Sequence, residues 1–348
     1  MSLSGLLRVI TDDPELKRAL DEADSPASPG GDLIAPPALR PFLVAALAGV
    51  GRAAAPRRFV LAVTATAREA EDLTAALGSL LPEGAAAYFP PWETLPHERL
   101  SPRSDTSGQR LAVLRRLAHP DPADARSGPL TVVATPVRCL LQPMVGGLGE
   151  LEPVRLRQDE SADLDDVVTR LVEIGYARTE LVEKRGDLAV RGGILDVFPP
   201  TEEHPVRVEF FGDTVEEIRF FRVADQRSLP PTSPAVSGLW APPCRELLLT
   251  PTVRSRARQL ADEWPGLSDV LGKVADGITV EGMEAFAPVL AERMELLLDH
   301  VPAGGCVVAC DPERIRARAA ELVRTSQEFL EASWVNAAAG GEVPIDLG

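Results

Sequence analysis

The chain has 348 residues, of which 45% are hydrophobic and 25% charged, enough apolar material for two or three domains. Its formal net charge of −16 argues against a protein that mainly coats DNA or an anionic membrane, because neutralising phosphates requires clustered Lys and Arg. The four cysteines form no CxxC pair, and no apolar run approaches the roughly 18 residues of a spanning helix. We therefore expect a reduced, cytoplasmic protein without a structural metal or a membrane partner. Only three of the 36 basic residues are lysines, which together with the abundance of Ala and Pro indicates a GC-rich bacterial genome.

The first part of the chain alternates helical and apolar strand patterns, as is typical of a parallel sheet covered on both faces. Residues 1–20 are expected to form an amphipathic helix, followed by a Pro/Gly/Ser linker at 24–31. The expected strands cover residues 32–35, 58–64, 84–89 and 130–135, and the expected helices cover 39–48, 67–81 and 106–117.

The pattern changes near residue 152. After an expected helix at 163–174, short alternating strands are predicted at 179–184, 187–191, 194–198, 206–211 and 216–221. Turn pairs such as Gly192-Gly193 and Gly212-Asp213 separate them, which is the signature of an antiparallel meander. Because such a block cannot continue a parallel sheet, we expect residues 152–230 to form an inserted α+β domain.

The last part of the chain is expected to return to the first sheet. A proline-rich stretch at 229–243 leads out of the insert, and it is followed by expected strands at 247–249 and 305–309 and expected helices at 252–263 and 311–333. The predicted fold class is thus α/β, a discontinuous parallel-sheet domain that carries an inserted α+β domain with an antiparallel sheet. The predicted boundaries are 1–30 for an N-terminal helix and linker, 31–151 and 231–348 for the two parts of the α/β domain, and 152–230 for the insert.

A nucleotide site in such a sheet would require a glycine-rich loop that ends in Lys-Ser or Lys-Thr after the first strand. The sequence there reads Ala35-Pro-Pro-Ala-Leu-Arg-Pro-Phe42, and no lysine lies between Lys17 and Lys184. Prolines supply no amide hydrogens to phosphate oxygens. We therefore expect neither ATP binding at this position nor another cofactor.

No catalytic constellation is evident elsewhere. The histidines His97, His119, His204 and His300 are far apart in sequence and are expected to be structural or solvated. Cys306 and Cys310 are expected to be buried core thiols, and Trp92 is expected to anchor an ordered loop. The sequence thus predicts no catalytic residue and no metal ligand.

Three motifs resemble a known family. They are Pro91-Trp-Glu-Thr-Leu-Pro96, Arg191-Gly-Gly-Ile-Leu-Asp-Val-Phe-Pro199 and Arg207-Val-Glu-Phe-Phe-Gly-Asp213. Together with their surroundings, over roughly residues 30–345, they resemble the N-terminal module of the bacterial transcription-repair coupling factors (the Mfd family). That module is itself similar to the excision-repair protein UvrB.

The resemblance implies a helicase-like, RecA-type lobe that has lost its nucleotide site, with an inserted domain that binds UvrA. UvrB proteins keep a glycine-rich loop ending in Lys-Thr where this chain has residues 35–42. Family proteins are ATP-dependent DNA translocases whose RNA polymerase-binding and motor domains follow this module, so we expect the chain to be an N-terminal part. It is expected to be monomeric and to recruit UvrA in transcription-coupled repair. The alternative is a UvrB-type, ATP-dependent DNA damage verifier or a helicase.

The resemblance also implies a set of UvrA-contacting positions, namely Arg178, Arg191, Phe198 and, from the UvrB proteins, Arg207. Arginines beside an aromatic ring are enriched at interface hot spots, and guanidinium groups pair well with carboxylates. The alternative is that the arginines are solvated charges and the ring is core, since residues 176–228 contain 8 basic and 11 acidic residues. Ala189 stands where UvrB proteins have another arginine, so the two contact sets differ.

Overall fold

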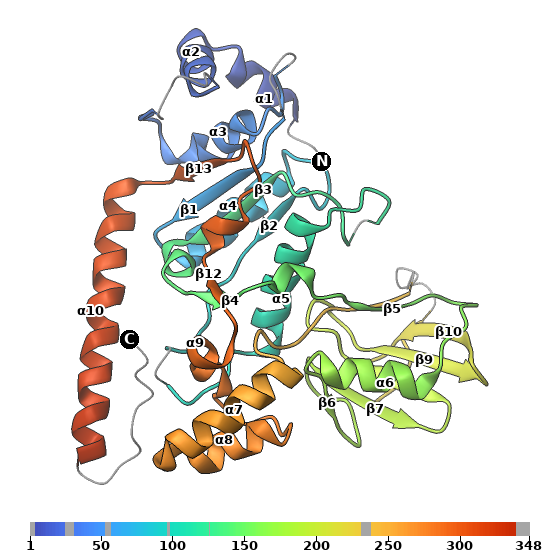
Figure 1. Ribbon diagram of the computed structural model, residues 1–348. Helices are drawn as coiled ribbons and strands as arrows, with labels where there is room; N and C mark the ends of the chain where they lie inside the picture. The colour runs from blue at the N-terminus through green and yellow to red at the C-terminus, as the bar shows by residue number, and fades with distance from the viewer. Residues whose placement is uncertain are drawn as a thin grey trace. The chain divides into compact units, whose positions relative to one another are not determined.

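The computed structural model describes residues 4–24, 31–52, 57–95, 98–124, 126–230 and 238–338 (Figure 1). It divides into two compact units, each built from segments that are distant in sequence. Unit 1 consists of Met1–Pro91, Val113–Pro143 and Leu296–Phe329, and unit 2 of Trp92–Ala112, Met144–Glu295 and Leu330–Gly348. The helices α5 (Ser104–Ala118) and α10 (Pro312–Ala338) each contribute residues to both units.

A four-stranded parallel sheet forms the centre of unit 1. Its strands are β1 (Val60–Thr64), β2 (Ala86–Tyr88), β3 (Val132–Pro136) and β13 (Cys306–Ala309), in the order β13-β1-β3-β2. Every residue of β1 and β3 is buried, as the continuous apolar runs predicted. The predicted return of the chain to this sheet is confirmed, because β13 pairs with β1.

Helices from the first 80 residues build the core on one face of this sheet. They are α1 (Ser4–Thr11), α2 (Pro14–Ala23), α3 (Arg40–Leu47) and α4 (Ala67–Gly78), with 3-10 turns at Pro37–Leu39, Val137–Leu140 and Leu297–His300 elsewhere in the unit. The single helix expected at 1–20 is two helices, because Asp13 caps the second and Pro14 occupies its first position. The strand expected at 32–35 is wrong: Ile34 is fully exposed and this segment has no strand partner among the described residues.

Unit 2 contains a five-stranded sheet in the order β10-β9-β8-β7-β6. The strands are β6 (Ala177–Arg178), β7 (Asp187–Arg191), β8 (Ile194–Val197), β9 (Val206–Phe211) and β10 (Thr214–Phe220). All neighbours pair antiparallel except β6 and β7. The two tight turns contain glycines in the left-handed region, Gly192 at φ 61° and Gly212 at φ 59°, where an L side chain would be strained.

The strand expected at 179–184 is wrong, and a side chain explains why. A carboxylate oxygen of Asp187 accepts hydrogen bonds from the backbone amides of Glu183 (3.1 Å) and Lys184 (3.0 Å). These amides are therefore held in a local turn and do not pair with a strand. Only Ala177 and Arg178 reach β7 as a short strand.

One face of the five-stranded sheet forms the main core of this part of unit 2. The residues of this core on β7, β8 and β9 alternate along the strands, and they pack on α6 (Leu164–Glu173) and on a two-stranded sheet of β5 (Val154–Leu156) and β11 (Leu239–Ala241). The sequence reading missed both strands of this second sheet, and β11 lies in the proline-rich stretch that was expected to be a connection. The core therefore extends beyond residue 230.

The rest of unit 2 is mainly helical, with α7 (Pro251–Glu263), α8 (Ser268–Ala275) and α9 (Ala287–Leu290), 3-10 turns at Leu148–Glu150, Pro265–Leu267 and Met283–Phe286, and the paired strands β4 (Met144–Val145) and β12 (Met294–Glu295). The strand expected at 247–249 is wrong, since Leu247 instead packs among these helices. The expected anchor Trp92 is buried, and its indole nitrogen donates to Glu246 at 2.8 Å. No helix in the described ranges is long and apolar enough to cross a bilayer.

Candidate interaction surface

The candidate site lies on the second face of the five-stranded sheet, opposite its apolar core. Successive side chains of a strand point to opposite faces, and directly paired residues share a face. One paired row joins Ala189, Asp196, Arg207 and Arg219, and the next joins Arg191, Ile194, Glu209 and Glu217. This face, which we call the polar face, therefore combines Arg191 and Arg207 from the predicted set, and Phe198 follows two residues after Asp196.

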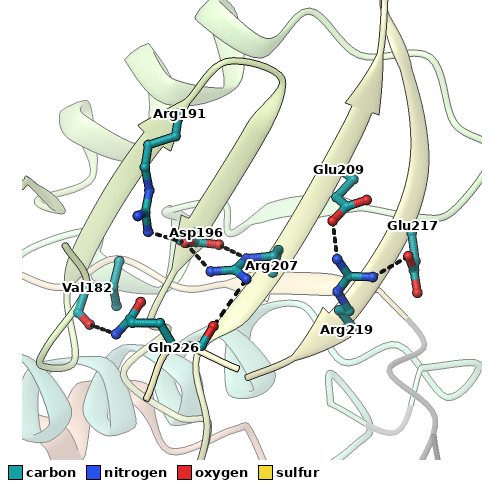
Figure 2. A network of polar contacts seen from close by, with 8 residues as sticks. All are labelled: Val182, Arg191, Asp196, Arg207, Glu209, Glu217, Arg219 and Gln226. Atoms are coloured by element: carbon teal, nitrogen blue, oxygen red, sulfur yellow. Dashed lines mark hydrogen bonds and ion pairs between the residues drawn. The ribbon is translucent and has the colours of Figure 1, made fainter. Parts of the chain in front are cut away.

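Asp196 is at the centre of the polar face (Figure 2). Its side chain is 1% exposed, and it accepts hydrogen bonds from two arginines. Arg207 binds both carboxylate oxygens, with Nε at 2.7 Å from Oδ1 and Nη2 at 2.8 Å from Oδ2. Arg191 reaches Oδ2 with Nη2 at 3.2 Å, while its own side chain remains 51% exposed. A single buried carboxylate thus binds the mostly buried guanidinium of Arg207 and the half-exposed guanidinium of Arg191.

The side chain of Arg207 is 15% exposed and is held by three groups. Besides Asp196, its Nη1 donates to the carbonyl oxygen of Gln226 at 3.3 Å, and its guanidinium lies 4.6 Å from the ring centre of Phe221. The hydrogen bond and charge of Asp196 raise the pKa of Arg207 above its ordinary value. This guanidinium has little freedom to reach a partner without giving up these contacts.

A second charged triad lies beside the first on the same face (Figure 2). Arg219 pairs with Glu209 and, at 2.5 Å, with Glu217. Two carboxylates share one arginine here, whereas in the first triad two arginines share one carboxylate. The formal charges therefore sum to +1 in the first triad and to −1 in the second.

Phe198 lies in a small apolar cluster at one end of the polar face. It is 6% exposed and packs with Val182, Ala189 and Phe221, and the guanidinium of Arg185 lies 5.1 Å from its ring centre. Ala189 is fully covered by the same cluster, so a longer side chain at this position would have to displace it.

Arg178 lies apart from the two triads. It is exposed on the edge strand β6, and its pairing with Leu188 assigns it to the opposite face of the sheet. Its side chain makes no hydrogen bond or ion pair with any residue in the described part of the chain. The structure therefore gathers three of the four predicted positions on one face and leaves Arg178 at the sheet edge.

Besides the second triad, Asp196 and Phe211 on this surface were not predicted as functional. Asp196 is a lone carboxylate in an otherwise apolar strand, which is a readable sign of a paired buried charge. The ring of Phe211, at the end of β9, is 80% exposed. Its neighbour Phe210 packs against the core, and only the strand register decides which of the two rings faces out.

The structure also describes residues 35–42, where the sequence analysis looked for a phosphate-binding loop. Pro37 begins a 3-10 turn and α3 begins at Arg40, directly followed by Pro41. The segment that would cradle a phosphate thus has prolines where amide donors are needed. Of the four histidines, His97 lies outside the described residues.

The part of the chain that forms the five-stranded sheet matches a known protein family. Residues 154–235 match the family described as the UvrB interaction domain. A transcription-repair-coupling factor of Mycobacterium bovis is 52% identical over 328 residues, which is 90% of this chain and 26% of that protein. One from Bacillus subtilis is 26% identical over 78% of this chain and 24% of that protein. The UvrABC system protein B of Streptomyces avermitilis is 33% identical over 40% of this chain and 20% of that protein. The chain spans about a quarter of the length of the coupling factors it matches.

Proposed function

Because the chain belongs to the transcription-repair-coupling factor family, we propose that it is the module that binds the excision-repair protein UvrA and recruits it in transcription-coupled repair. The observation that carries this proposal is the polar face within the matched UvrB interaction domain, where Arg191 is presented half-exposed on a buried carboxylate. We assign the binding to residues 152–230, which is also the predicted extent of the inserted domain.

The four predicted positions take two kinds of role in this proposal. Arg178 and Arg191 are exposed and contact UvrA directly, through carboxylates of the partner. Arg207 and Phe198 lie beneath the surface, where they hold Asp196 and the sheet end in place. UvrA should therefore present acidic groups to the Arg191 side of the sheet.

We further propose that this chain itself has no ATPase site. The prolines at the start of α3 and the absence of lysine between Lys17 and Lys184 support this reading. Contacts with RNA polymerase and with DNA, and translocation by ATP hydrolysis, are assigned to regions of the relatives that this chain does not span. A UvrB-type damage verifier is not favoured, because the matched UvrABC system protein B covers 40% of this chain and the mycobacterial coupling factor covers 90%.

The test is calorimetric titration of purified UvrA with the chain and with charge-reversal variants. Arg191→Glu and Arg178→Glu should each weaken binding by some 30-fold to several thousand-fold, the range for losing a charged anchor of about 2–5 kcal/mol. Arg222→Glu is the matched control. Arg222 is 52% exposed and pairs with Asp225 at 2.8 Å, so its exposure and pairing resemble those of Arg191.

The control should change the affinity by less than about fivefold, as expected for a solvated ion pair. Circular dichroism of every variant verifies that the fold is intact. Equal affinities of all four proteins would assign the arginines to the solvated surface. An absence of binding by the wild-type chain would refute the recruitment role itself.

A further inference from the structure

Phe211 is the most exposed aromatic side chain in the described part of the chain. It is 80% exposed, compared with 53% for Phe329 and 45% for Trp334 on α10. Single apolar residues on a surface are common and have no meaning by themselves. A binding role for Phe211 must therefore be argued from its position in the sheet.

Phe211 lies on the polar face, at the end of the sheet that also carries Arg191. Arg191 is paired with Ile194, and Ile194 with Glu209. Phe211 follows Glu209 by two residues on β9 and therefore points to the same face. Arg191 ends β7 and Phe211 ends β9, each directly before a glycine turn.

The backbone holds the turn between β7 and β8 against the end of β9. The amide of Phe210 donates to the carbonyl oxygen of Gly193 at 2.8 Å. A Cβ on Gly193 would lie 2.8 Å from the carbonyl oxygen of Phe210, so only glycine permits this close approach. Arg191 and Phe211 are thus presented from a rigid frame, which reduces the entropy lost on binding.

We propose that Phe211 is the aromatic contact of the UvrA-binding surface, and that it enters an apolar pocket of UvrA beside the acidic groups that meet Arg191. This inference rests on the proposed function and refines it. The predicted aromatic contact, Phe198, is 6% exposed under the guanidinium of Arg185, so its ring has no free face to offer. Aromatic and arginine side chains are enriched at protein interfaces, and Arg191 and Phe211 lie on the same face at the same end of the sheet.

The experiment titrates UvrA with the full chain carrying Phe211→Ala, Phe211→Trp or the control Phe329→Ala. Phe329 is the matched control because it is also an exposed phenylalanine, but it lies on α10, outside the matched domain. Phe211→Ala should weaken binding by about 30-fold or more, the threshold of a hot spot. Phe211→Trp should retain binding within a few-fold, since indole is favoured at such sites. Phe329→Ala should bind like the wild type.

The tryptophan variant provides a second, independent readout. Its emission, taken as the difference from the wild-type chain, should shift to shorter wavelength when UvrA is added, because the indole leaves water. This readout serves even if Phe211→Ala alters the fold as seen by circular dichroism. An unshifted emission at saturating UvrA would overturn the inference.

The outcomes separate this inference from the function on which it rests. If Arg191→Glu abolishes binding while Phe211→Ala binds like the wild type, the aromatic contact is refuted and the UvrA-binding role stands. Equal losses in Phe211→Ala and Phe329→Ala would also refute the contact, because the effect would not be specific to the polar face. If the wild-type chain does not bind UvrA, the proposed function fails and this inference fails with it.

Discussion

Replacing Asp196 by alanine should destabilise the five-stranded sheet far more than removing a carboxylate of the second triad. The side chain is 1% exposed and binds two guanidinium groups, so its removal leaves Arg207 and Arg191 without the carboxylate that both of them contact. Breaking a fully buried ion pair costs about 3–5 kcal/mol. Here Arg191 is half solvated and Arg207 retains the Gln226 carbonyl and the Phe221 ring, so we expect about 2–3 kcal/mol.

Native-state hydrogen exchange is the appropriate measurement, because it reports the stability of this sheet separately from that of unit 1. The amides of β8 and β9 should lose roughly 30- to 150-fold in protection in Asp196→Ala. Glu217→Ala removes an exposed carboxylate from the second triad and should change protection by less than about fivefold. If the two variants have equal protection, Asp196 does not organise this face and our reading of its burial is wrong.

Two further predictions follow from the rest of the chain. Millimolar Mg-ATP should leave the melting temperature of the chain unchanged, because the prolines before and within α3 leave too few amide donors to bind phosphate. A ligand that binds the native state would stabilise it by RT ln(1 + [L]/Kd), so a rise of several degrees would contradict this prediction. A fragment of residues 152–245 should give a dispersed amide NMR spectrum. It should also melt at a higher temperature than residues 152–230, because Leu239, Ala241 and Cys244 complete the core of the sheet. Equal melting temperatures of the two fragments would show that β11 does not contribute to the stability of this domain.

The alternation of apolar residues was the reliable signal for the fold. The predicted bounds of β7 and β9 agree with the structure, because one face of each strand packs on the main core and the residues on that face are apolar. The strands β1 and β3 were predicted from a different pattern, because a strand that is buried on both faces requires a continuous apolar run. Both patterns are local in sequence and need no knowledge of the partner strand.

The errors occur where a distant group decides the structure. Residues 32–35 and 247–249 have strand-like composition, but neither finds a strand partner in the described structure. At 179–184 the carboxylate of Asp187 accepts hydrogen bonds from backbone amides that would otherwise pair with a neighbouring strand. The strand β11 is flanked by prolines, and its pairing with β5 lies some 85 residues back in the chain, which no local pattern reveals.

The candidate site shows the same division between local and distant information. The motif around Arg191 was sufficient to identify the domain, but exposure depends on register and on packing. Register directs Phe210 to the core and Phe211 to solvent, and it places Asp196 opposite Arg207. The exposure of Phe211 and the pairing of Asp196 with Arg207 distinguish residues that can contact a partner from residues that support them. The residue types alone predict neither the exposure nor the pairing.

The charge distribution on the polar face explains how an acidic chain can offer arginines to a partner. The chain carries −16 overall, so a binding surface cannot rely on a general positive field. The shared carboxylate of Asp196 leaves a net positive triad on the β7–β9 side, and the shared guanidinium of Arg219 leaves a net negative triad on the β9–β10 side. A face with opposite charges at its two sides accepts a complementary partner in one orientation and repels it when reversed, which gives specificity without a large net charge.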